Sequence, residues 1–86
     1  MVNFMVRLEY LNKTKTTSGI IKFNFSFVNQ DGIGDISFYT FTDLSGYKIS
    51  EYAGQPEDYI DFGVLLLKYR LEILKMVTEH LHDKIY

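Results

Sequence analysis

Hydrophobic and polar residues alternate along the first half of the chain, which is the pattern of strands with one buried face. The alternation covers residues 2–10 and residues 21–27, and the repeated phenylalanines of the second stretch make it the clearest strand. Residues 36–42 also read as a strand, but aromatic side chains occupy both registers, so the pattern does not assign its inner face. A short fourth strand at residues 47–52 is left open.

Short polar connections separate these strands. Residues 12–19 are polar and end in Gly19, so we expect a mobile hairpin loop there. Asp31-Gly32 is a hairpin signal, and residues 44–47 indicate another turn. Because strands joined by short connections usually pair in opposite directions, the sequence predicts an antiparallel meander.

The C-terminal part of the chain, residues 59–86, predicts one long helix. It contains no proline and a single glycine, Gly63, and it is rich in residues that favour helices. Pro56 followed by two acids is typical of a helix start. The predicted fold class is therefore α+β, in a single domain of residues 1–86. A three- or four-stranded antiparallel meander is followed by one long C-terminal helix packed on one sheet face.

This helix carries two apolar stripes rather than one. The first follows three- and four-residue spacing through Ile60, Val64, Leu67, Leu71, Leu74, Leu81 and Ile85. The second lies on roughly the opposite side and contains Phe62, Leu65, Leu66, Tyr69, Ile73 and Met76. A surface helix normally has one apolar face, so both stripes require a cover. We expect the first stripe to pack on the sheet.

The second stripe is the predicted interaction surface. The chain has no second helix to cover it, and a long exposed apolar stripe exceeds the patches that monomers usually tolerate. We expect it to bind a second copy of the chain, giving a homodimer, or to bind another protein of unknown identity. The alternative is that the segment before the helix, residues 46–55, covers it.

Composition narrows the functional classes. The chain has no cysteine, which excludes disulfides and thiolate chemistry, and its net charge is −2. No secretory signal is visible, and the apolar run at residues 64–67 is far too short to span a bilayer, so we expect a cytoplasmic protein without a membrane segment. The bias toward Phe, Tyr, Ile and Lys suits an AT-rich genome. This bias bears on origin and not on activity; together with the small size and the acidity of the chain, it leads us to expect a small phage or mobile-element protein that inhibits a host protein.

No residue cluster predicts catalysis, a cofactor or a bound metal. His80 and His82 point in different directions on a helix, and only His80 with Asp83 has a spacing that could hold a metal weakly. The acids around Gly32 do not match a calcium-binding loop. The chain also lacks a cysteine nucleophile and a Gly-x-Ser-x-Gly elbow, so we expect a non-enzymatic protein.

Nucleic-acid binding is the alternative function. An antiparallel sheet can lay its open face in a groove. The residues expected to contact a nucleic acid are Arg7, Lys22 and Asn24 on that face and Lys13 and Lys15 on the first loop. Acidic residues outnumber basic ones by 11 to 9, which argues against a dominant phosphate-binding surface.

Overall fold

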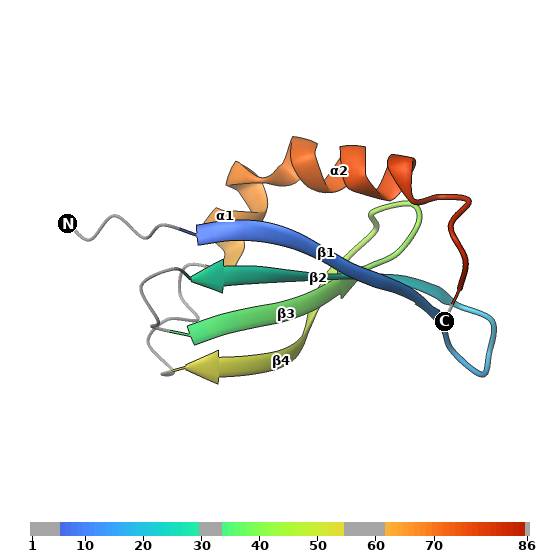
Figure 1. The fold of residues 1–86 in the computed structure, drawn as a ribbon, viewed down its shortest axis with the longest axis horizontal. Coiled ribbons are helices and arrows are strands. Elements are labelled where there is room, and N and C mark those ends of the chain that lie inside the picture. Colours follow the sequence, from blue (N-terminus) through green and yellow to red (C-terminus); the bar gives the residue numbers. More distant parts are fainter. Residues whose placement is uncertain (1–5, 30–33, 55–61, 86) are drawn as a thin grey trace.

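The computed structural model of this chain describes residues 6–29, 34–54 and 62–85 (Figure 1). The first residues of the first predicted strand, the Asp31-Gly32 turn and the predicted helix start around Pro56 lie outside the described residues.

The strands form a single antiparallel sheet. Its members are β1 (Val6–Lys15), β2 (Ile21–Asn29), β3 (Gly34–Thr40) and β4 (Tyr47–Gly54). They lie side by side in the order β1-β2-β3-β4, and each pairs antiparallel with the next. The predicted meander is thus confirmed, and the strand that the sequence left open is present as β4.

Strand β1 extends well beyond the predicted end of the first strand. It pairs with β2 as far as Lys15 opposite Ile21, so the first half of the expected loop at residues 12–19 is strand instead. The turn is short, and Gly19 adopts a φ of 90° that glycine tolerates best. The ladder also shifts between Tyr10 and Asn12. This bulge changes the alternation, because one extra residue moves every later side chain to the other face.

Phenylalanines from the two central strands make the core. Phe23, Phe25 and Phe27 of β2 and Phe38 of β3 are all buried, and Ile36 is buried beside them. The Phe38 ring stacks on those of Phe25 and Phe27, at centroid distances of 5.5 and 4.8 Å. The inner register of β3 is therefore the one that contains Ile36 and Phe38, which the alternation alone did not decide.

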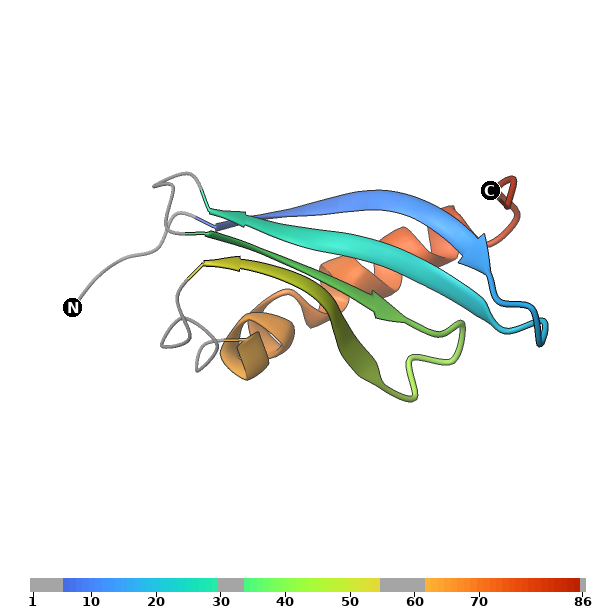
Figure 2. The same cartoon turned by 90° about the horizontal axis from the view of Figure 1, so that it is seen from below.

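Two helices cover one face of the sheet, and no helix or strand among the described residues covers the other, which we call the open face (Figures 1 and 2). They are α1 (Phe62–Lys68) and α2 (Arg70–Glu79), so the prediction of one long helix is only partly correct. Neither of them, among the residues that the structure describes, is long and apolar enough to cross a membrane.

The helical chain changes direction at Tyr69, which has φ −101° and ψ 12°. Helical hydrogen bonding nevertheless continues through this residue. The Tyr69 N–H donates to the Leu65 carbonyl, and its own carbonyl accepts from Ile73, both at 2.9 Å. Beyond Glu79 the described residues are turn and irregular structure rather than helix.

The prediction of which stripe faces the sheet is wrong. Ile73 is fully buried, and the rest of the predicted interaction surface, namely Phe62, Leu65, Leu66, Tyr69 and Met76, packs against the core. The Phe62 ring lies 5.5 Å from that of Phe38, and the Tyr69 hydroxyl donates a 2.6 Å hydrogen bond to the Val6 carbonyl. This stripe carries the aromatic side chains, which reach the phenylalanine core, so it is the one that the sheet covers.

Candidate interaction surfaces

The described residues of the stripe that was expected to face the sheet are exposed instead, and Ile60 lies outside the described residues. We call Val64, Leu67, Leu71 and Leu74 the outer stripe; they are 61%, 75%, 78% and 46% exposed. They repeat at intervals of three and four residues along α1 and α2. That spacing matches the a and d positions of a heptad, the seam through which one helix packs against another.

Basic side chains border the outer stripe on both sides. Arg70 stands three residues after Leu67 and four before Leu74. On the other side, Lys68 and Lys75 stand three residues before and four residues after Leu71. Residues three and four apart are neighbours on a helix surface, so within α2 Arg70 lies beside Leu74 and Lys75 lies beside Leu71.

The end of α2 is tied to the sheet by a buried lysine. Lys13 of β1 is only 4% exposed, and its Nζ donates to the carbonyl oxygens of Leu81 and Asp83, at 2.5 and 3.3 Å. The same Nζ lies 5.4 Å from the centre of the Phe23 ring. The bulge in β1 turns Lys13 toward the helices, so it is absent from the open face where nucleic acid was predicted to bind.

His80 lies at the same end of the molecule. Its ring stacks on Tyr10 at 3.8 Å, and its Nδ1 is paired with the Asp83 carboxylate. Among the described residues, no group of three or more histidine or carboxylate side chains is placed to hold a metal ion. The predicted absence of a metal site remains a prediction.

The open face of the sheet carries a mixed polar surface. Arg7 is paired with Glu9 at 2.6 Å, and Lys22 lies over the Tyr39 ring at 4.2 Å from its centre. Asn24 donates to the Asn12 side chain at 3.0 Å. Of the residues predicted to contact nucleic acid, the strand register places Arg7, Lys22 and Asn24 together here. Lys15 lies instead at the end of β1, in the register of Lys13.

Sequence reasoning missed the aromatic part of this face. The Tyr39 and Phe41 rings form an edge-to-face pair at 5.7 Å, and Lys48 is paired with Tyr39 across the β3–β4 ladder. The signal was present in the alternation of residues 36–42. Because Phe38 belongs to the core, Tyr39 and Phe41 belong to the opposite register. Knowing which register faces the core would therefore have predicted that these two aromatic residues lie on the open face.

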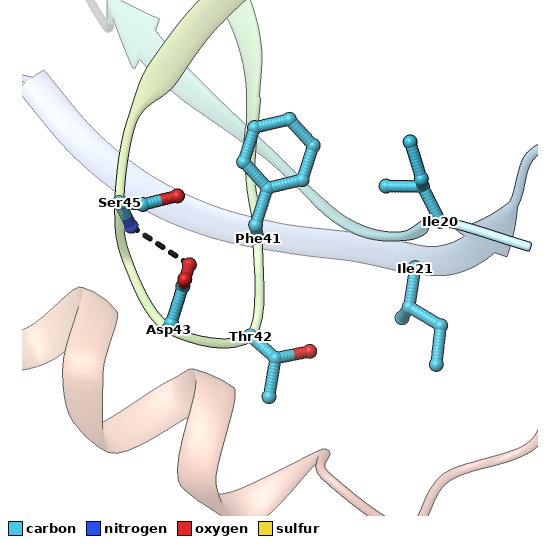
Figure 3. A pocket seen from close by; sticks show the side chains of 6 residues that line it. All are labelled: Ile20, Ile21, Phe41, Thr42, Asp43 and Ser45. Carbon is cyan, nitrogen blue, oxygen red and sulfur yellow. Dashed lines mark hydrogen bonds between the residues drawn. The ribbon is translucent and has the colours of Figure 1, made fainter.

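A hollow of about 500 Å³ lies between the start of β2 and the turn from β3 to β4 (Figure 3). Its walls are Ile20, Ile21, Phe41, Thr42, Asp43 and Ser45. Hydrogen bonds from the Ser45 side chain and backbone N–H lower the pKa of Asp43 below its usual value of 3.8. A carboxylate stabilised in this way is a weaker base than an ordinary one, so it is poorly suited to take up a proton in catalysis.

Comparisons of the chain with models of protein families, with curated proteins and with solved structures find no match. The two surfaces described above, the outer stripe and the open face, are therefore the candidate functional surfaces.

Proposed function

We propose that this chain is a non-enzymatic protein–protein interaction module whose docking surface is the outer stripe. The observation that carries the proposal is the exposure of Leu67 and Leu71, at 75% and 78%, in the middle of an apolar row with heptad spacing. Covering such side chains removes apolar surface from water, which is the main driving force for association. Leucines in a row supply the anchors that a partner helix requires.

The proposed mechanism is occlusion. The sheet and its phenylalanine core hold α1 and α2 in place, so the outer stripe is presented already ordered and loses little conformational freedom on binding. We also propose that the chain is a small phage or mobile-element protein that inhibits or regulates a host protein in the cytoplasm, as expected from its sequence.

Two occupants fit an exposed apolar stripe. One is a second copy of the chain, which would give the homodimer expected from the sequence, now through the outer stripe. The other is a different protein. The docking surface can be tested without deciding between them.

A photo-crosslinking amino acid provides that test. It would replace Leu71 in one variant and Ser37, on the open face of the sheet, in the matched control. Both variants would be expressed and irradiated in the cells in which the chain naturally acts. We expect protein adducts at position 71 and few or none at position 37, because only the outer stripe lies against a partner. Adducts at position 37 alone, or at neither position, would refute this docking surface.

Nucleic-acid binding by the open face is the second candidate. Its support is the group formed by Lys22, Tyr39 and Lys48, because cations beside aromatic rings are a common way to hold single-stranded nucleic acid. Arg7 contributes less than the sequence suggested, since Glu9 already neutralises it. Salt-dependent binding of a labelled oligonucleotide, lost in Lys22→Ala with Lys48→Ala, would favour this function. Binding that these changes leave intact would exclude the site.

A further inference from the structure

We propose that the occupant of the outer stripe is an amphipathic helix of a different protein, with its own apolar row flanked by acidic residues. This inference rests on the proposed function and names the chemistry of its partner. It follows from the charges around the outer stripe rather than from its apolar character, which a second copy would match equally well.

The cations are positioned to meet a partner. Lys68, Arg70 and Lys75 are exposed and border the leucines on both sides of the outer stripe. Within α2, in heptad terms, Leu71 occupies position a and Leu74 occupies position d. Arg70 then stands at position g and Lys75 at position e, and Lys68 ends α1, before the change of direction at Tyr69. The e and g positions are those that contact the flanks of a paired helix and select its charge.

The acids of the same helices do not border the outer stripe. The acids among the described residues of α1 and α2 are Glu72 and Glu79. Neither of them is three or four positions away from any residue of the outer stripe. Glu79 pairs with Lys75 at 3.9 Å, with the two side chains 55% and 77% exposed. A pair that long and that exposed contributes little free energy, so it leaves Lys75 able to turn to a partner's carboxylate. The border of the outer stripe is therefore basic.

A second copy would bring like charges together in either orientation. In a parallel pair, position g of one helix faces position e of the other, which sets Arg70 against Lys75 of the second copy. In an antiparallel pair, e faces e and g faces g, which sets lysine against lysine and arginine against arginine. Such contacts are unfavourable and disfavour self-pairing. Glutamates or aspartates at the partner's flanking positions would instead pair with all of these cations.

The test uses two synthetic helical peptides of roughly 21 residues, enough for three heptads. Both have leucine at positions a and d and the same neutral residues elsewhere, but one has glutamate and the other lysine at positions e and g. Each carries a fluorescent label and is titrated with the full chain at low peptide concentration, by fluorescence anisotropy. We expect the glutamate peptide to bind at least about tenfold more tightly at low salt. The difference should shrink at about 0.5 M NaCl, where charges are screened.

Charge reversal supplies the matched control. In Lys68→Glu with Arg70→Glu and Lys75→Glu, the preference should pass to the lysine peptide. Reversing three exposed cations elsewhere, with Lys15→Glu, Lys48→Glu and Lys84→Glu, changes the net charge equally and should leave the preference for glutamate in place. A preference that follows net charge alone, or a lysine peptide that binds the unaltered chain as tightly as the glutamate peptide, would overturn the inference.

Two further outcomes separate this inference from the proposed function. If neither peptide binds but the crosslinker at position 71 still gives protein adducts, the docking surface stands and the acidic helix is wrong. If light scattering shows a dimer that Leu67→Glu with Leu71→Glu abolishes, the occupant is a second copy. The absence of both peptide binding and adducts would remove the docking surface itself.

Discussion

Lys13 joins the sheet to the end of the helical layer through its own side chain. A lysine that is almost fully buried needs hydrogen-bond acceptors for its ammonium group, and it finds them in the Leu81 and Asp83 carbonyls. Both carbonyls lie beyond the end of α2, in the turn and irregular segment, and the ammonium group gives each of them a charged hydrogen-bond donor. The bulge in β1 is what turns Lys13 to this side.

Replacing Lys13 should therefore destabilise the fold. We expect Lys13→Ala to lower the free energy of unfolding by about 1–3 kcal/mol, through lost hydrogen bonds and lost packing on Phe23. Urea denaturation followed by circular dichroism measures the change. Lys15→Ala, at an exposed position of the same strand, is the control and should change stability by less than about 0.5 kcal/mol. Equal effects of the two substitutions would contradict this role for Lys13.

Asp43 supports a pH prediction. Ser45 donates its backbone N–H to the Asp43 carboxylate at 3.0 Å. Its hydrogen bonds favour the charged form, so the pKa of Asp43 lies below 3.8 in the folded chain. These hydrogen bonds therefore stabilise the folded chain at a pH above the pKa that Asp43 has in the unfolded chain. This stabilisation is lost as the pH falls through the lower pKa that Asp43 has in the folded chain. An NMR titration of the Asp43 carboxyl should show the low pKa, and Ser45→Ala should raise it. Ser18→Ala should leave it unchanged, and a wild-type pKa at or above 3.8 would refute the contact.

At the scale of elements, the two helix stripes have opposite roles that stability measurements can separate. Ile73→Ala should cost about 2–5 kcal/mol, because it leaves a cavity at a fully buried position on the sheet side. Leu71→Ala should change the free energy of unfolding by less than about 0.5 kcal/mol, since the side chain is 78% exposed. Urea unfolding of both variants gives the comparison. A larger loss of stability in Leu71→Ala than in Ile73→Ala would mean that the stripe containing Leu71 packs on the sheet, as the sequence predicted.

Strand β2 and the part of β1 before its bulge were predictable because alternation with one buried face has a single solution, whereas aromatic side chains occupy both registers of residues 36–42 and the inner face of β3 was not. The helix faces were not, because both stripes are apolar at helical spacing and no polar face opposes either of them. Only the long-range contacts of Phe62 and Tyr69 with the core decide between the stripes. The bend at Tyr69 was also hidden, since neither proline nor glycine stands there. Lys13 was expected on a loop, but β1 continues through it, and the bulge between Tyr10 and Asn12 turns its side chain toward the helices. Local sequence gives little sign of such a bulge.

At the scale of the whole molecule, two opposing forces act between copies of the chain. Burial of the outer stripe favours self-association, and the basic border opposes it. The hydrophobic force persists at high salt, whereas repulsion between exposed charges falls once salt screens them. The dependence of solution mass on salt therefore reports which of the two dominates.

We expect light scattering at fixed protein concentration to give a monomer mass at about 50 mM NaCl and a rising mean mass toward about 1 M NaCl. The rise should disappear in Leu67→Glu with Leu71→Glu, which places charges within the stripe, and should persist in the open-face control Lys22→Ala. The triple reversal of Lys68, Arg70 and Lys75 replaces one repulsion by another, so it should remain monomeric at low salt. A dimer at low salt that dissociates as salt increases would mean that attractive ion pairs hold two copies together. The basic border would then have to face acids of the second copy, and the case for a separate acidic partner would fail.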